Sequence, residues 1–310
     1  MKSSLFFRFP AIILCLSLWL FLSGCDSGSS VSSTEPPVFS PLQVLVPEAP
    51  GKETIGSSPL VLDISEKNQG YLTAESDSSD SSMNLQISTP TEVLYSYFIS
   101  PGETAVIPFS EGNGDYMITC YQQVSGDQYA ALYMETVTVE LSNEFLPFLY
   151  PNQYVNFTPE SKASKLALSM VTEDTEDLEA LELIYNYVTE NLTYDYRKAD
   201  TVGTGYLPDV DETLGTGTGI CFDYAALTAA MLRSCDIPCK LQIGYAGDIK
   251  HAWIDVYIRS KGWVTGAVSF NGDSWSLMDP TFDSSADSDD TEAIQDYIGN
   301  ADNYTVQFTR

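Results

Sequence analysis

Histidine and basic residues are scarce in this sequence. The 310 residues include one histidine, His251, and 14 lysines and arginines against 43 aspartates and glutamates. A zinc site built from several imidazoles is therefore excluded. The formal net charge of −29 repels polyanions, so we expect neither nucleic acid nor anionic lipid to bind the folded part of the chain.

Cysteine is scarce as well, which excludes the disulfide framework of small secreted proteins. Beyond the first 25 residues the thiols are Cys120, Cys221, Cys235 and Cys239. Cys120 lies in the alternating run YMITCYQ and is predicted to be a buried apolar residue. For the pair in CDIPC we favour free thiols, because a helix end and a residue past a proline need not align their Cβ atoms. A local disulfide is the alternative, and a cysteine-only zinc site would need two further thiolates from elsewhere.

The chain begins with an apolar stretch, MKSSLFFRFPAIILCLSLWLFLSGC, which follows positive residues and ends at small ones. It is short for a membrane span, so residues 1–24 are predicted to be a cleaved export signal. The ending LSGC resembles the lipobox of bacterial lipoproteins. That resemblance implies that Cys25 carries a lipid anchor and that the protein faces the extracytoplasmic side of a bacterial cell membrane. An ordinary secretory signal with an incidental Cys25 is the alternative.

The next two segments differ in their patterning. Residues 25–45 are rich in serine and proline and lack apolar periodicity, which predicts a tether. Residues 46–145 contain short alternating runs between turn residues, typical of an all-β, sandwich-like domain. These runs are PLVLDI, EVLYSYFI, TAVIPF, DYMITCYQ and METVTVEL. This domain has no histidine, phosphate-binding loop or cluster of metal ligands, so we expect a spacer. Carbohydrate or protein binding is the alternative.

Helical periodicity begins in the region 150–310. A set of apolar residues recurs every three or four positions and marks one helix face, namely Leu178, Leu181, Tyr185, Val188 and Leu192. The segment GYLPDVDETLGTGTG is predicted to be a loop. The helix that follows it, in GICFDYAALTAAMLRS, is apolar nearly all round and therefore belongs to a core. It should end near Asp236, which tolerates the turn conformation, and before Pro238.

Beyond this helix the apolar period falls to two, in CKLQIGYA, HAWIDVYI, GWVTGAVSF, SWSLMD and YTVQF. Turn sequences, including Asn271-Gly272, separate these runs. The expected fold class is therefore α+β, with a buried helix on an antiparallel sheet, preceded by the all-β domain.

Cys221 lies where the loop becomes the core helix. The unpaired N–H groups and the dipole of a helix start lower the pKa of a thiol, and the thiolate is the nucleophile. The same N–H groups can stabilise an oxyanion. His251 is the candidate base, and it needs an orienting carboxylate. Asp255 lies about 13 Å along the same strand, whereas Asp279 ends a strand expected in the same sheet, where neighbours approach to about 5 Å. Asp279 is the better candidate.

These motifs carry a family resemblance. GTGTGICFDYAALTAAMLRSCDIPCKLQIGYAG, HAWIDVYI, GW and LMDPTF resemble, in order and spacing, the transglutaminase-like superfamily of papain-fold cysteine enzymes, from about Leu178 to Phe282. The resemblance implies a catalytic triad in which Cys221 is the nucleophile, His251 the general base and acid, and Asp279 the orienting group. Asp236 stands where the family usually has glycine, a change that should be harmless.

Three aromatic residues are further candidates. The family's oxyanion is also stabilised by a side chain upstream of the nucleophile, which makes Tyr194 or Tyr196 a candidate donor. Packing of the first helix is the alternative role for either tyrosine. Trp253 is expected to shield the site from water rather than to contact substrate.

No cofactor or metal is expected. The acidic run FDSSADSDDTEA lacks the ordered spacing of a calcium loop and should be a solvated loop.

The predicted activity is acyl transfer from an amide through a thioester, as a peptidase, deamidase or transamidase acting on cell-surface proteins or peptides. The alternative belongs to another class of protein, a non-catalytic surface binding or scaffolding lipoprotein with a relic papain-like domain.

Overall fold

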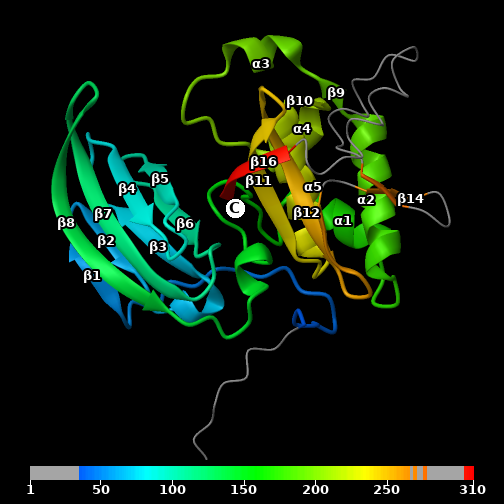
Figure 1. Cartoon of the computed structure of the whole chain (residues 1–310), viewed down its shortest axis with the longest axis horizontal. Helices are drawn as coiled ribbons and strands as arrows, with labels where there is room; N and C mark the ends of the chain where they lie inside the picture. Colours follow the sequence, from blue (N-terminus) through cyan, green and yellow to red (C-terminus); the bar gives the residue numbers. More distant parts are fainter. Residues whose placement is uncertain (1–34, 266–267, 271–274, 278–303) are drawn as a thin grey trace, which may run out of the picture. The chain divides into compact units, whose positions relative to one another are not determined.

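The alternating runs of the first half form two antiparallel sheets of four strands each (Figure 1). The computed structural model describes residues 35–265, 268–270, 275–277 and 304–310. One sheet has the order β1-β2-β3-β6, with β1 Thr54–Ser57, β2 Leu60–Asp63, β3 Tyr71–Ser76 and β6 Thr104–Pro108. The other has the order β5-β4-β7-β8, with β4 Met83–Ser88, β5 Leu94–Ile99, β7 Gly114–Ser125 and β8 Gln128–Val139.

Both sheets contribute to one hydrophobic core, because alternate residues of each strand face inward. Leu62 and Leu72 come from one sheet, Leu85 and Ile118 from the other, and all four side chains are buried in one cluster. Cys120 lies in the same cluster and is fully buried. The sandwich-like fold and the burial of Cys120 are confirmed, whereas β1, β3 and β4 were not predicted.

The end of the predicted tether is part of the folded body. Val44 and Leu45 are buried in two different hydrophobic clusters, and Asn143 donates a hydrogen bond to the carbonyl of Glu35. The run QVLV contains apolar side chains whose burial stabilises the fold. The serine- and proline-rich residues before it contain few such side chains. The chain from Ser32 to Arg310 groups into one compact unit, so a domain boundary between residues 145 and 150 stays a prediction.

Helices form most of the segment before the second sheet. They are α1 Lys162–Met170, α2 Asp177–Asn191, α3 Tyr196–Thr201, α4 Val210–Thr216 and α5 Cys221–Ser234. The structure confirms α2, whose buried residues include Leu181, Tyr185 and Val188, and it confirms the core helix α5. None of the helices among the described residues is long and apolar enough to cross a membrane.

Helix α4 corrects the prediction of a loop over residues 205–219. The Asp209 side chain accepts hydrogen bonds from the backbone N–H groups of Asp211 and Glu212, which caps the helix start. Gly217 ends the helix in the left-handed conformation, with φ 64°, which glycine adopts without steric cost. Both caps are local, so a single turn or two of helix forms where no apolar period is long enough to predict it.

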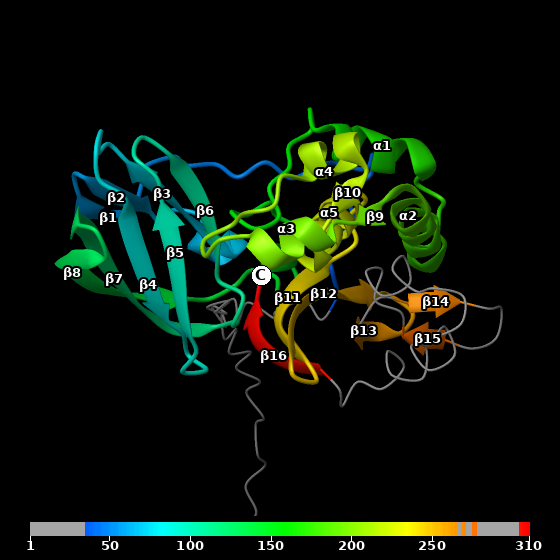
Figure 2. The same ribbon diagram turned by 90° about the horizontal axis from the view of Figure 1, so that it is seen from above.

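The second half contains a four-stranded sheet in the order β13-β12-β11-β16, in which every pair of neighbours is antiparallel. Its strands are β11 Cys239–Ala246, β12 Ile249–Ile258, β13 Gly262–Thr265 and β16 Tyr304–Thr309. Figure 2 shows β14 Val268–Phe270 and β15 Trp275–Leu277 beside each other, and they pair in a separate two-stranded sheet. The predicted α+β class, a helix on an antiparallel sheet, is confirmed.

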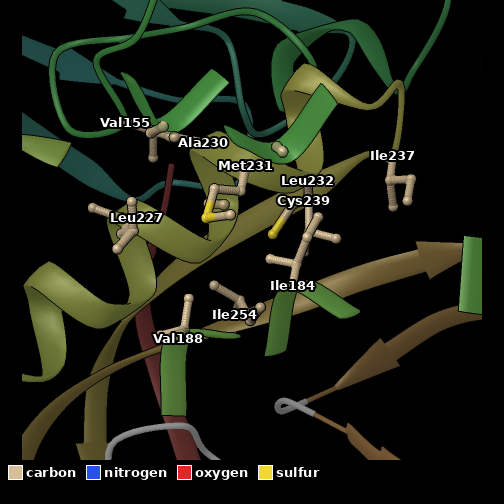
Figure 3. Packing of buried hydrophobic residues seen from close by; sticks show 14 of the residues in the cluster. Val155, Ile184, Val188, Leu227, Ala230, Met231, Leu232, Ile237, Cys239 and Ile254 are labelled. Carbon is tan, nitrogen blue, oxygen red and sulfur yellow. The ribbon is translucent and has the colours of Figure 1, made fainter. Parts of the chain in front are cut away.

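Helix α5 occupies the core of this second half. Its residues Leu227 and Met231 are fully buried together with Ile184 of α2 and Ile254 of β12, and Figure 3 shows these side chains gathered in one cluster. A helix with apolar side chains on every side is stable only when other helices and strands pack against every side. Cys235 and Cys239, at the end of the helix and the start of β11, are buried free thiols, as predicted.

Arg233, near the end of α5, is fully buried, and no aspartate or glutamate side chain of the described residues pairs with it. Its guanidinium donates hydrogen bonds to main-chain oxygens of three separate segments, at Cys239, Tyr150 and Arg310. Burial lowers the pKa of Arg233 to about 10, so the side chain stays charged at neutral pH. One cation therefore joins α5, β11, β16 and the segment before α1.

Candidate active site

Cys221 is the first residue of α5, as the change of period at this point predicts. The residue before it, Ile220, has extended backbone torsions, φ −101° and ψ 175°, and serves as the N-cap. Cys221 is half-buried, whereas the other described thiols, Cys120, Cys235 and Cys239, are buried. It is therefore the described thiol with the best access to a reagent or substrate.

Asp223 fixes the backbone on which Cys221 sits. Its carboxylate Oδ2 accepts a hydrogen bond of 2.8 Å from the backbone N–H of Ile220, so it caps the helix from the third helical position. Gly219 lies so close that a Cβ added there would be 2.7 Å from the Asp223 Cβ. A side chain at position 219 would therefore push the cap, and the residues next to Cys221, out of place.

Two side chains from the segment before α4 also bind the Asp223 carboxylate. Tyr206 donates a hydrogen bond of 2.5 Å to Oδ1, and the Lys198 ammonium lies 2.7 Å from Oδ2. Lys198 also donates to the Tyr206 hydroxyl at 2.7 Å, and its charge lies 4.5 Å from the Tyr206 ring centre. We call Lys198, Tyr206 and Asp223 the cap cluster.

The cap cluster pairs a buried carboxylate near the thiol with a positive charge. Asp223 is fully buried, and an unpaired carboxylate there would disfavour a second negative charge on Cys221. Lys198 supplies the compensating positive charge. Burial alone would lower the pKa of Lys198, but hydrogen bonds to Asp223 and Tyr206 and the charge of Asp223 raise it above its usual value. Burial and the hydrogen bond to Asp223 raise the pKa of Tyr206 to about 12.

The two candidate tyrosines differ in their placement. Tyr194 ends the short strand β9 Thr193–Tyr194, which pairs in parallel with β10 Thr218–Gly219, so Tyr194 lies opposite Gly219. The next residue strengthens this pairing, because the backbone N–H of Asp195 donates to the Gly219 carbonyl at 2.8 Å. Tyr196 begins α3 and is 64% exposed. Tyr194 therefore lies opposite a residue that is only two positions before Cys221 in the sequence, whereas Tyr196 lies at the surface.

His251 lies near the start of β12, opposite Gly244 of β11. It is 5% exposed, and its ring stacks with that of Trp253, with centres 6.2 Å apart. Both side chains alternate along the strand with Ala252 and Ile254, which pack in the cluster that contains α5. Because successive side chains of a strand point to opposite faces, His251 and Trp253 lie on the face of the sheet opposite to the one that packs in the α5 cluster. A contact between His251 and Cys221 stays a prediction.

The prediction that the strand before Asp279 belongs to the same sheet as His251 is wrong. Strand β15, which precedes Asp279, pairs with β14 and not with the sheet that contains β12. Asp279 itself, Cys25 and the acidic run 282–293 lie outside the described residues, so their roles stay predictions.

Asp255, the other carboxylate considered for His251, is described, and its Oδ2 accepts a hydrogen bond of 2.7 Å from Gln242. Within the described residues no three histidine, cysteine or acidic side chains form a group that could hold a metal ion.

The cap cluster was missed by the sequence analysis, although a signal for it exists. Asp223 is the one acidic residue of an otherwise apolar helix, and a buried carboxylate requires partners. It also stands three residues after the helix N-cap, the position from which a side chain can reach back to the N-cap N–H. Its partners Lys198, in the short helix α3, and Tyr206, in the loop after it, could not be deduced, because this segment has no apolar periodicity.

We expect Asp223→Asn to slow the reaction of Cys221 with iodoacetamide and to lower stability by about 1–3 kcal/mol, because the cap and its ion pair weaken. The measurement is alkylation followed by peptide mapping, together with thermal unfolding. Lys198→Met should slow the reaction further, because the buried Asp223 carboxylate then has no positive partner beside Cys221. Asp211→Asn is a matched control, because Asp211 accepts hydrogen bonds from the start of α1 instead. A Cys221 reactivity that falls equally in the Asp211 and Asp223 variants would contradict a local role for the cap.

A comparison with protein families matches part of the chain. Residues 164–266 match the family model of the transglutaminase-like superfamily. The chain thus contains a transglutaminase-like domain, with the papain-like α+β core of a cysteine enzyme family and a β-rich region before it.

Among solved structures, the chain is similar to a candidate cysteine protease from Cytophaga hutchinsonii, at 15% identity and a TM-score of 0.33, covering 68% of this chain and 74% of that one. It is also similar to red sea bream transglutaminase, at 13% identity and a TM-score of 0.25, covering 68% of this chain and 48% of that one. A comparison with curated proteins gives no match.

Proposed function

We propose that this protein is an extracytoplasmic, lipid-anchored cysteine enzyme that transfers the acyl group of an amide through a thioester on Cys221. The observation that carries the proposal is the placement of a half-buried thiol at the first turn of α5, within a transglutaminase-like domain. A helix start offers N–H groups that have no partner within the helix, and these can stabilise both a thiolate and an oxyanion.

The proposed reaction has two halves. In the first, His251 takes the Cys221 proton, the sulfur bonds to the amide carbon, and the carbonyl electrons move to oxygen. The tetrahedral intermediate collapses, the C–N bond breaks, and His251 returns the proton to the leaving amine. In the second half, water or an amine attacks the thioester with His251 as base, and Cys221 leaves as the thiol. Water gives peptidase or deamidase activity, and an amine gives transamidation.

Several residues around Cys221 fit supporting roles in this reaction. Tyr194 is proposed to donate to the oxyanion, because the pairing of β9 and β10 holds it opposite Gly219. Asp279 is proposed to orient His251, and Trp253 to limit access of water.

The lipid anchor is proposed from the LSGC sequence at Cys25, followed by the serine-rich residues after it. A lipid on Cys25 would place the enzyme at the outer surface of the cell membrane, where surface proteins and wall peptides are the available amides.

The test is the rate of Cys221 alkylation by iodoacetamide, measured by peptide mapping of the full chain across about pH 5 to 9. Peptide mapping is required because Cys15 and Cys25 can also react. We expect folded Cys221 at neutral pH to react at least about tenfold faster than in the urea-unfolded chain. His251→Ala should move the rise in rate to higher pH, whereas Lys250→Ala, an exposed neighbour on β12, should not.

The opposite result would favour the non-catalytic scaffolding protein. If Cys221 reacts at the unfolded rate and His251→Ala has no effect, the papain-like domain is a relic, and the proposed enzyme function is wrong.

A further inference from the structure

A pocket of about 200 Å³ lies at the end of α5 opposite to Cys221. Four segments line it: residues 38–42, the connection between α1 and α2 with the start of α2, the turn from α5 to β11, and Arg259 after β12. The fourteen residues of α5 span about 20 Å, so this pocket is separate from the proposed active site. Its volume is several times the roughly 30 Å³ that one water occupies in the liquid, which leaves room for a small organic ligand.

Asp236, which lines this pocket, is a buried carboxylate whose side chain makes no hydrogen bond. The residue is 2% exposed, and neither Oδ1 nor Oδ2 has a hydrogen-bond partner. The backbone N–H of Phe39 lies near the Asp236 carboxylate and favours its charged form, but the two groups do not have the geometry of a hydrogen bond. Burial outweighs this contact and the charge of Arg259, and raises the pKa of Asp236 to about 7.

Asp236 also occupies a backbone conformation that costs free energy. Its φ is 59°, in the left-handed region that favours glycine. The sequence thus accepts two costs at one position, a strained backbone and an unsatisfied buried acid, although glycine would remove both. Aspartate in place of the family's glycine at position 236, which was expected to be harmless, therefore lowers the stability of the protein without ligand. A ligand that donates to the carboxylate would offset that cost.

The other charges of the pocket do not satisfy Asp236. The Arg259 side chain and backbone N–H both bond to the carboxylate of Asp177, and one guanidinium nitrogen donates to the Asp236 carbonyl at 3.2 Å. Glu173 accepts a hydrogen bond from Ser40, and Asp174 adds another carboxylate to the rim. With Arg259 balanced by Asp177, the pocket keeps an excess of negative charge.

We propose that this pocket binds a primary ammonium group on a short apolar stem, with its N–H donated to the Asp236 carboxylate. The apolar part would lie against Val171, Ile237 and the half-buried Leu42, which also line the pocket. An ammonium supplies both the charge and the hydrogen bonds that the carboxylate lacks. A metal ion fits less well, because no three potential ligands come together among the described residues. The inference does not depend on the proposed enzyme function.

The experiment is thermal unfolding of the full chain in detergent, with and without n-butylammonium chloride. We expect n-butylammonium to raise the unfolding midpoint of the unaltered protein, and 1-butanol, which has no charge, to leave it unchanged. Asp236→Gly should raise the midpoint in the absence of ligand and abolish the shift caused by n-butylammonium. A larger shift with Nα-acetyl-lysinamide would identify a lysine side chain of a peptide as the source of the ammonium, and a smaller one a free amine.

Glu92→Gly is the matched control. Glu92 has a similar backbone conformation, φ 64°, but is exposed and lies outside the pocket. This variant should keep the full n-butylammonium shift. The proposal is overturned if Asp236→Gly and the unaltered protein respond equally to n-butylammonium, or if Asp236→Gly unfolds at a lower temperature without ligand. It is equally overturned if K⁺ or Ca²⁺ produces the Asp236-dependent shift and n-butylammonium does not.

Discussion

Cys221→Ala should abolish the burst of p-nitrophenol that the full chain releases from p-nitrophenyl acetate, and should lower steady-state release by at least about 1,000-fold. The burst reports acylation of the nucleophile, because one equivalent of alcohol leaves as each thiol forms its thioester. Mass spectrometry of the quenched protein should locate the acetyl group on the peptide that contains Cys221.

The same substitution should leave the fold almost intact. Cys221 is half-buried at the helix start, so exchanging its sulfur for hydrogen should change stability by less than about 1 kcal/mol. Cys235→Ala is the matched control, because Cys235 is a buried thiol at the other end of the same helix and should retain the full burst. Loss of folding in Cys221→Ala, or acetylation that persists elsewhere at the same rate, would make Cys221 a structural residue.

Arg233→Met should produce the largest loss of stability, about 3–5 kcal/mol, because it removes the donor that holds three chain segments together. The main-chain oxygens of Cys239, Tyr150 and Arg310 would remain buried without that donor. Each such group costs about 1–3 kcal/mol when its partner is lost. For a chain of this size we expect the thermal midpoint to fall by roughly 10 °C.

Two further substitutions separate the hydrogen bonds of Arg233 from its charge. Arg233→Lys keeps the positive charge but not the planar group that donates to three main-chain oxygens, so it should lose most of the same stability. Arg259→Met removes an arginine that is 36% exposed and pairs with Asp177, and it should cost about 1 kcal/mol or less. If Arg233→Met and Arg259→Met unfold at the same temperature, the guanidinium is not what joins these segments.

The elements that the sequence predicts best are those with a long and regular apolar period. Helix α5 and strand β11 begin and end close to where the apolar pattern places them. Helix α4 depends on caps at Asp209 and Gly217, which act over a few residues and leave no periodic pattern. Strands β3 and β4 pair in part with β6 and β7, which are more distant in sequence, so tertiary pairing outweighs their weak local preference. Strand β1 pairs with the adjacent β2, but its four residues TIGS contain too little apolar surface to predict a strand.

The candidate site divides in a similar way. Position 221 follows from the change of period and the family resemblance, and the structure confirms that a helix begins there. The cap cluster and the unsatisfied Asp236 depend on which side chains meet across loops, which one sequence does not encode in any pattern. The position of strand β15 was wrong because its small sheet with β14 has the same alternation as a strand of the larger sheet.

Strand β16 has a consequence for how the protein is made. It pairs with β11 across about sixty residues of intervening sequence, and the carbonyl of Thr305 approaches Gly244 so closely that a Cβ at Gly244 would be 1.9 Å from it. Until β16 has been synthesised, β11 is an open edge strand, and open edges pair with other chains. A nascent or truncated chain without residues 304–310 would therefore be prone to aggregate, and a chaperone that keeps the chain unfolded until synthesis is complete would protect the half that contains β11 most.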